Sequence, residues 1–291
     1  MKVYTYYDQI PGLPCQTDLI DLWKKSWSSR GYDPVVLNDT DARKHPRYEQ
    51  FCSYITELHK EIKQEPIQKY GLSCYLRWLA YATTDDPACI TSDYDVLNFN
   101  LDTNIFDTKN IHLMVAGTPC LVSGSADLFD QFSQMFIDTM IEHVDVWRGT
   151  FKDNVWLNDQ EFLARCLYTG EKSTRQKFVE KYNLNVNYDW GKFCENYKGV
   201  QTKQKHPCVH YAHHALHEYM PILRGDQTMN TIKLFEKFLQ DYNIGFENGH
   251  FTQVPKLTQL QFNKEIDWTC NYQENIHRFR LLVMYLDLHN V

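Results

Sequence analysis

The stretch GLSCYLRWLAYATTDDPACITSDYDVLN (residues 71–98) decides the fold, because a helical pattern passes into a strand that carries acids. Apolar residues at positions 72, 75, 76, 79 and 80 recur at helical spacing and predict a helix over 71–84. The β-prone run 88–96 predicts a strand with Asp93 and Asp95 two positions apart. Burying two carboxylates costs free energy unless a positive group meets them, so this pair draws attention as a site.

The flanking sequence predicts an α/β sheet around this stretch. A strand over 2–6, a helix over 17–30 and a strand over 34–38 form the usual opening of such a sheet. Further patterns predict helices over 47–64, 126–144 and 158–170, and strands over 111–116 and 119–125. The C-terminal part predicts helices over 228–242 and 273–289. We therefore expect an α/β domain over 1–225 and a helical extension over 226–291, packed on the same domain.

Composition narrows the classes of function. The 291 residues have a formal net charge of -7, which weakens the case for a nucleic-acid partner because phosphate binding needs a basic surface. Nine cysteines without a CxxC pair are typical of reduced thiols. No window approaches 18 apolar residues, and the N-terminal stretch lacks the pattern of a signal peptide. We expect a cytoplasmic protein, soluble or loosely peripheral, with no integral membrane segment.

The acid pair has two interpretations. Side chains alternate along an extended strand, so Asp93 and Asp95 point the same way and Tyr94 points to the other face. Hard oxygen ligands suit Mg²⁺ or Mn²⁺, and open α/β sheets bind ligands beyond the carboxyl ends of their strands. The alternative is a solvated turn without a ligand.

This region resembles the DXD-containing sugar-binding region of the GT-A glycosyltransferases, most closely the family of capsular-polysaccharide and Och1-like enzymes. In that family a helix with Ser-Asp-x-x-Arg-Tyr precedes a strand that ends in Asp-x-Asp. Ser73 and Arg77 keep the Ser/Arg spacing, Trp78 takes the place of the aromatic residue, and the acid pair is kept. Cys74 replaces the aspartate of the family pattern, and TTDDP replaces its Gly-Gly turn.

The resemblance implies a GT-A type, Rossmann-like α/β/α sandwich with a mixed sheet, and transfer of a sugar from a nucleotide sugar to an acceptor hydroxyl. Asp93 and Asp95 would hold Mn²⁺ or Mg²⁺, which neutralises the leaving diphosphate. Arg77 would make a forked contact with phosphate, and the alternative is a surface salt bridge. The residues expected to bind the donor are Tyr4, Thr5, Tyr6, Ser73, Arg77 and Asp93. For the three N-terminal residues, ordinary strand packing is an equal alternative.

Two later fragments extend the resemblance. NDQEF (158–162) is similar to an Asp-Gln pair that retaining GT-A enzymes carry near the sugar and the acceptor, so Asp159 is a candidate catalytic residue together with Arg77. Its alternative role is helix capping. CVHYAHHAL (208–216) offers His210 as a third metal ligand, with His213 and His214 in reserve. A zinc site made of histidines alone is the rival, and it lacks the spacing of zinc motifs.

Three functions follow from these patterns. The first is a metal-dependent glycosyltransferase of the hexosyltransferase type, which takes a UDP- or GDP-linked sugar donor and a glycan or glycoconjugate acceptor and retains the anomeric configuration. The second is a catalytically inactive GT-A scaffold that binds nucleotide sugars. The third is a metal-dependent phosphohydrolase, which normally needs acid and histidine clusters after several strands. The sequence has neither a P-loop nor a G-x-S-x-G motif.

Overall fold

The computed structural model describes residues 1–11, 15–102, 109–115, 118–150, 157–169, 172–186, 193–196, 206–212, 244–247 and 250–253, together with Arg280, Met284 and Leu288. Its first strand is β1 (Lys2–Tyr6), which lies between two other strands in the main sheet. Val3, Tyr4 and Thr5 are buried in succession. Both faces of this strand are therefore covered, as in the parallel sheets of α/β proteins.

The main sheet has six strands in the order β2-β1-β3-β6-β5-β7. Besides β1, they are β2 (Asp33–Leu37), β3 (Cys89–Ser92), β6 (Leu121–Gly124), β5 (Ile111–Leu113) and β7 (Leu184–Val186). β1 pairs in parallel with β2 and β3, and β5 pairs in parallel with β7. β6 runs antiparallel to both of its neighbours. The sheet is mixed, and the carboxyl ends of β1, β2 and β3 lie at the same edge.

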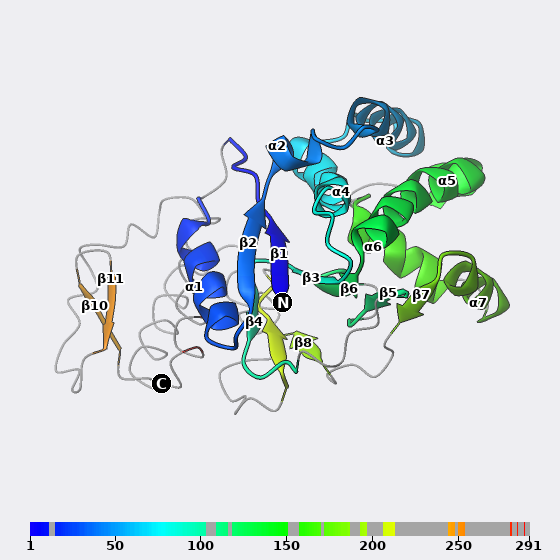
Figure 1. Cartoon of the computed structure of the whole chain (residues 1–291). Coiled ribbons are helices and arrows are strands. Elements are labelled where there is room, and N and C mark those ends of the chain that lie inside the picture. The colour runs from blue at the N-terminus through cyan, green and yellow to red at the C-terminus, as the bar shows by residue number, and fades with distance from the viewer. Residues whose placement is uncertain are drawn as a thin grey trace.

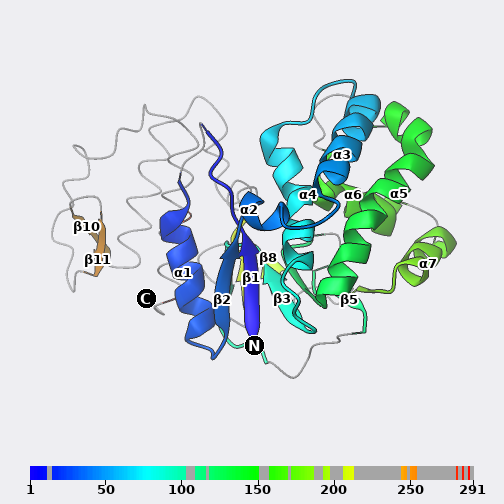
Figure 2. The same ribbon diagram turned by 45° about the horizontal axis from the view of Figure 1, so that its top comes forward.

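Helices cover both faces of this sheet. α1 (Thr17–Ser28) lies on one side of β1 and β2, as Figures 1 and 2 show. The other side carries α2 (Asp39–Ala42), α3 (Tyr48–Lys63), α4 (Lys69–Ala82) and α5 (Ala126–Thr150). Val3 packs with residues of α1, whereas Tyr4 packs with residues of α3, α4 and α5. The α/β/α sandwich with a mixed sheet, expected from the sequence, is confirmed.

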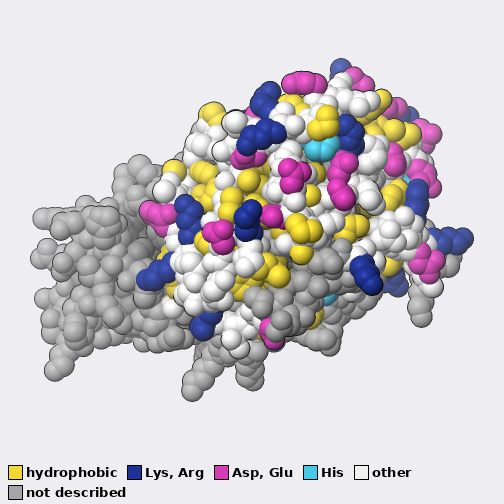
Figure 3. All heavy atoms as spheres, viewed as in Figure 1, with side chains coloured by type: hydrophobic (Ala, Val, Ile, Leu, Met, Phe, Trp, Pro, Cys, Tyr) yellow, Lys and Arg dark blue, Asp and Glu magenta, His cyan; other side chains and the backbone are white. Residues whose placement is uncertain are grey.

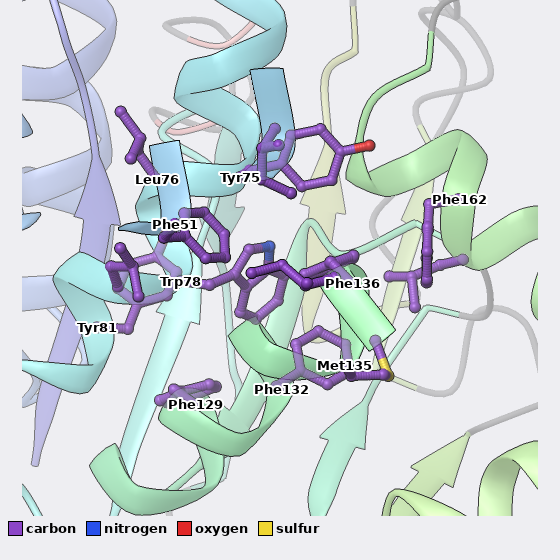
Figure 4. Close-up of a cluster of buried hydrophobic side chains, with 14 of the residues drawn as sticks. Phe51, Tyr75, Leu76, Trp78, Tyr81, Phe129, Phe132, Met135, Phe136 and Phe162 are labelled. Carbon is purple, nitrogen blue, oxygen red and sulfur yellow. The ribbon is translucent and has the colours of Figure 1, made fainter. Parts of the chain in front are cut away.

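Aromatic side chains fix α4 against α5. The Trp78 side chain is fully buried, and its ring lies 4.5 Å from that of Phe132 and 6.0 Å from those of Phe129 and Phe136, measured between centroids. Figure 4 shows these rings gathered between the two helices. Of these pairs, the one between Trp78 and Phe132 is edge to face, an arrangement that adds to the free energy of burial. This packing fixes the orientation of α4, and with it the neighbouring Arg77.

A second, smaller sheet lies next to the main one. β4 (Val96–Asn98) pairs antiparallel with β9 (Cys208–His210), and β9 pairs in parallel with β8 (Cys194–Asn196). α6 (Asp159–Ala164) continues into a single π-helical segment, η2 (Arg165–Thr169), and α7 (Lys172–Lys181) leads to β7. The small sheet brings two distant parts of the chain together at the carboxyl end of β3.

Most of the predicted elements up to residue 150 are confirmed, and one is corrected. The predicted helices 47–64 and 71–84 correspond to α3 and α4, and the helix predicted over 126–144 runs on to Thr150 as part of α5. The single strand predicted over 88–96 is wrong, because β3 ends at Ser92 and the chain turns before β4. The polar run 92–95 interrupts the β-prone pattern at that point.

The division into 1–225 and 226–291 stays a prediction, because most of the second range lies outside the described residues. So do the helices predicted over 228–242 and 273–289, apart from Arg280, Met284 and Leu288, which are helical. Within the same range the structure has a β-hairpin that the sequence did not predict, formed by β10 (Ile244–Glu247) and β11 (His250–Gln253).

The surface mixes charges of both signs. On the face shown in Figure 3, acidic and basic side chains are interspersed over the helices. The eight cysteines that the structure describes are free thiols. Within the described ranges, none of the helices combines the length and the hydropathy that crossing a bilayer requires.

Candidate functional site

The acid pair lies in a turn. The backbone N–H of Val96 donates to the carbonyl of Asp93 at 3.0 Å, which closes a four-residue turn between β3 and β4. The N–H of Asp93 donates to the carbonyl of Cys120 at 2.8 Å, so the turn is anchored to the main sheet. The sequence argument that strand alternation places the two acids on one face is therefore wrong. The turn brings them together instead, at the strand end where the site was expected.

His210 joins this turn through the small sheet. The pairing of β4 with β9 sets His210 opposite Val96, and the N–H of Tyr211 donates to the carbonyl of Asp95 at 2.8 Å. His210 Nε2 lies 3.5 Å from Asp95 Oδ1. One ligand atom from each of Asp93, Asp95 and His210 lies within 4.8 Å of the others. The structure thus brings together the three residues that the sequence proposed as metal ligands.

This donor set fits a divalent cation. Two carboxylates are the hard oxygen ligands that Mg²⁺ and Mn²⁺ prefer, and an imidazole nitrogen is better suited to Mn²⁺ than to Mg²⁺. Asp95 and His210 are only 7% and 4% exposed, so charges here are weakly screened by water. Asp93 is less buried, with 29% of its side chain exposed. A cation held here would keep positions open for other oxygen ligands.

Two tryptophans of α1 donate hydrogen bonds to residues at the two ends of the turn. Trp23 Nε1 donates to the hydroxyl of Ser92 at 2.8 Å, just before the turn. Trp27 Nε1 donates to the carbonyl of Val96 at 3.1 Å, at its end. Both indoles are fully buried. The helix that opens the α/β fold therefore also sets the position of the acids.

Trp27→Phe is expected to lower the free energy of unfolding by about 1–3 kcal/mol, because the buried carbonyl of Val96 loses its indole donor. Trp23→Phe is the matched comparison and is expected to cost less, since the Ser92 hydroxyl still donates to the carbonyl of Asp93 at 2.9 Å. Urea unfolding of the two variants measures both effects. Equal costs would show that these indoles act through packing alone.

Arg77 bridges the turn to a second part of the chain. Its Nη1 donates to Asp93 Oδ1 at 2.6 Å, and its Nε donates to Asp159 Oδ2 at 2.7 Å. The side chain is 12% exposed. Desolvation by burial acts to lower the pKa of Arg77, but the charges of Asp159 and Asp93 outweigh it and raise that pKa well above its usual value. Arg77 therefore stays charged and neutralises two acids at once.

Asp159 is the second acid on Arg77, and it does not cap its helix. The side chain of Asn158 caps α6 instead, by accepting from the N–H of Glu161 at 2.9 Å. Asp159 is 1% exposed and also accepts from Trp78 Nε1 at 2.9 Å. Burial raises the pKa of the Asp159 carboxyl, and the charge of Arg77 opposes this. Asn158 thus caps the helix, and the buried carboxylate of Asp159 is connected through Arg77 to Asp93.

Arg280 is a site residue that sequence analysis did not propose. Its Nη2 is paired with Asp95 Oδ2, and its guanidinium carbon lies 5.6 Å from the ring centroid of Tyr94. Burial lowers the pKa of this guanidinium below its usual value. A pattern in the sequence could have found it. Arg280 falls one helical turn before the buried Met284, so a charge stands on the apolar face of a predicted helix.

The residues expected to bind the donor lie in different surroundings. Tyr4 is buried in the core and its hydroxyl is paired with Asp86. Thr5 is fully buried, and the Tyr6 hydroxyl donates to Asp8 Oδ2 at 2.6 Å. The ring of the next residue along, Tyr7, contacts that of Tyr94 at 5.7 Å, edge to face, which sequence analysis did not propose. Tyr7 therefore links the end of β1 to the acidic turn.

Ser73 and the two reserve histidines are the remaining residues of the predicted site. Ser73 is half-buried on α4, one turn before Arg77. His213 and His214 lie outside the described residues, and so does the cluster of histidines proposed as a rival zinc site, except for His210.

Known proteins similar to this chain include a family of unknown function and solved structures of a galactosyltransferase. Residues 1–102 match a family described as a domain of unknown function (DUF8765). No curated protein matches. A crystal structure of galactosyltransferase LgtC with donor and acceptor sugar analogues matches at 10% identity and a TM-score of 0.39, over 83% of this chain and 96% of that chain. A structure of an active-site mutant of LgtC matches at 10% identity and a TM-score of 0.40, over 88% and 98%.

Proposed function

We propose that this chain is a metal-dependent glycosyltransferase that moves a hexose from a UDP- or GDP-linked donor to a hydroxyl of a glycan or glycoconjugate. The observation that carries the proposal is the cluster of Asp93, Asp95 and His210 at the carboxyl end of β3. Ligands of open α/β sheets bind at this end of the strands. Two acids and an imidazole there, on a mixed α/β sandwich, suit a cation that binds a diphosphate.

The metal ion, Mn²⁺ or Mg²⁺, would be held by Asp93, Asp95 and His210, and when bound it would neutralise the negative charge of the leaving diphosphate. We assign Arg77 a positioning role. Its donors are taken up by Asp93 and Asp159, so it fixes the direction in which Asp93 faces the ion. This replaces the forked phosphate contact suggested by the sequence.

Asp159 holds the other end of that bridge. Its buried carboxylate accepts from Arg77 and from Trp78, and the contact with Arg77 helps to hold that guanidinium against Asp93. We propose that this bridge sets the floor of the pocket for the transferred sugar. Tyr7 and Tyr94 lie at the end of β1, where the base and ribose of the donor are proposed to bind.

We propose retention of the anomeric configuration, with a leaving phosphate oxygen accepting the proton of the acceptor hydroxyl. Within the described cluster, both buried acids are already paired with arginines, Asp159 with Arg77 and Asp95 with Arg280. Neither is placed to act as a general base. The configuration of the product, read by NMR, tests this directly, and an inverted linkage would exclude it.

The proposed function predicts that a nucleotide sugar stabilises the protein only when Mn²⁺ is present. A ligand at 100 times its dissociation constant raises the melting midpoint by about 5 °C for a chain of this size. A thermal-shift panel of UDP- and GDP-sugars, each with and without Mn²⁺, measures the shift. Asp95→Asn should abolish it. Asp21→Asn, which changes an exposed acid of α1, should keep it and is the matched control.

Two outcomes would change the assignment. A shift that is the same with EDTA would exclude the metal from donor binding. The absence of any shift with a folded protein would exclude nucleotide sugars as ligands. A Mn²⁺-dependent shift without release of nucleoside diphosphate in the presence of mixed acceptors would favour the inactive scaffold.

A further inference from the structure

We infer that Arg280 and the divalent cation compete for Asp95, so that loading of the metal site weakens the burial of Arg280. The inference rests on the proposed function and deepens it, because it names a control on the same metal site. It starts from the contact between Arg280 Nη2 and Asp95 Oδ2. A residue from the far end of the chain thus supplies the counter-charge of a proposed metal ligand.

The guanidinium of Arg280 is almost fully buried at this contact. Arg280 is 4% exposed, and its Nε is buried without a hydrogen-bond partner in the part of the chain that the structure describes. Its described neighbours are Asp95 and Tyr94, which also forms a side-chain hydrogen bond with it, and it interacts with the charges of Asp93 and Tyr70. Asp95 pairs directly with this buried cation, so whatever weakens that pair weakens the burial of Arg280.

The negative charges of Asp93, Asp95 and Asp159 are paired with only two arginines, Arg77 and Arg280. Arg77 serves both Asp93 and Asp159, with Nη2 at 2.5 Å from Asp159 Oδ2. Asp95 is served by Arg280. Three carboxylates therefore face two guanidinium groups, which leaves one negative charge with neutral histidine. A divalent cation reverses this to one positive charge.

This reversal gives the sign of the coupling. A cation on Asp95 takes the carboxylate charge that holds Arg280, and two positive groups then share one buried carboxylate. Each therefore disfavours the other. The coupling is reciprocal by thermodynamic necessity: the factor by which Arg280 lowers the metal affinity is the factor by which the metal disfavours the burial of Arg280. Met284, one turn further and fully buried, would be loosened with it.

The first measurement is the affinity of the full chain for Mn²⁺, read from the electron paramagnetic resonance of free Mn²⁺. Arg280→Met is expected to bind Mn²⁺ about 10-fold more tightly than wild type, within the usual range of coupling between sites. Arg280→Lys keeps the charge and is the matched control, with affinity close to wild type. Equal or weaker binding by Arg280→Met would overturn the inference.

The second measurement needs no variant and covers the case in which Arg280→Met does not fold. Hydrogen exchange of the peptide that contains Arg280 and Met284 is followed in the wild-type chain. Saturating Mn²⁺ should speed its exchange, and in Asp95→Asn the exchange should be fast without Mn²⁺ and insensitive to it. Slower or unchanged exchange in wild type with Mn²⁺ would overturn the inference.

Failure of this inference can be told apart from failure of the proposed function. One outcome is that wild type binds Mn²⁺, Asp95→Asn does not, and Arg280→Met binds it with the affinity of wild type. This outcome would support the metal centre and reject the competition. An absence of Mn²⁺ binding in wild type and in Arg280→Met alike would reject the metal centre, and the competition with it.

Discussion

Asp95→Asn is expected to reduce release of nucleoside diphosphate from a nucleotide sugar by about 10³-fold or more, because the cation proposed to neutralise the leaving group would lose a buried ligand. The Asp95 carboxylate lies next to both His210 and Arg280. The neutral amide of the Asn variant cannot provide a negative charge to either of them. The assay is product release with the donor identified by thermal shift, at saturating and at limiting Mn²⁺.

A second acid variant guards this experiment against a folding artefact. Asp93→Asn removes a ligand that is more exposed and leaves the pair between Asp95 and Arg280 in place, so the same loss of activity is expected with a smaller change in stability. Circular dichroism and the melting midpoint of both variants separate the two effects. Full turnover in both variants would show that the acid pair is a structural turn.

Arg77→Met is expected to lower the free energy of unfolding by about 3–5 kcal/mol, which is the usual cost of leaving a buried charge without its partner. Asp159 would be that charge, at 1% exposure and with Trp78 and the backbone N–H of Gln160 as its remaining donors. Urea unfolding at neutral pH measures the loss. Arg43→Met, which breaks an exposed ion pair on α2, is the matched control and should leave stability unchanged.

The pH dependence of Arg77→Met gives an independent check. Burial already raises the pKa of Asp159, and Arg77 is the main group that opposes this. Without Arg77, the folded-state pKa of Asp159 rises further above its unfolded value, so the folded variant binds the proton more readily. Its stability deficit should therefore shrink as the pH falls from 7.5 to about 5. Arg77→Met/Asp159→Asn should recover much of the loss at neutral pH, since the amide oxygen can still accept from Trp78.

A deficit in Arg77→Met that is constant with pH and unrelieved by Asp159→Asn would mean that Arg77 stabilises the fold through packing. The double variant would then be no better than the single one. Mn²⁺ affinity measured on the same proteins reports separately on the direction in which Asp93 faces the site.

Local patterns in the sequence were enough to predict the α/β scaffold, the acid pair and the position of Arg77. Helical spacing predicts α4, runs of β-prone residues predict β1 and β3, and the acid pair stands out because two carboxylates end an apolar run. Arg77 follows from its position one turn after Ser73 on that helix. These inferences depend on neighbours within a few residues, which a single sequence records directly.

The tertiary structure decided how the acids meet their partners. Strand alternation was the wrong reason for the pairing of Asp93 with Asp95, because a hydrogen-bonded turn ends β3 first. Asn158 takes the helix cap and leaves Asp159 for Arg77, although both residues suit the cap equally by type. Only the three-dimensional contacts distinguish such neighbours.

The sequence by itself thus determined an α/β sandwich with a pair of acids at the end of a central strand and a histidine among the candidate ligands. The tertiary structure alone decided that His210 reaches those acids through the pairing of β9 with β4, and that Arg280 holds Asp95 from the C-terminal segment. The physical reason is that strand pairing and the burial of a charge depend on residues far apart in the chain. Local periodicity carries no information about which of them meet.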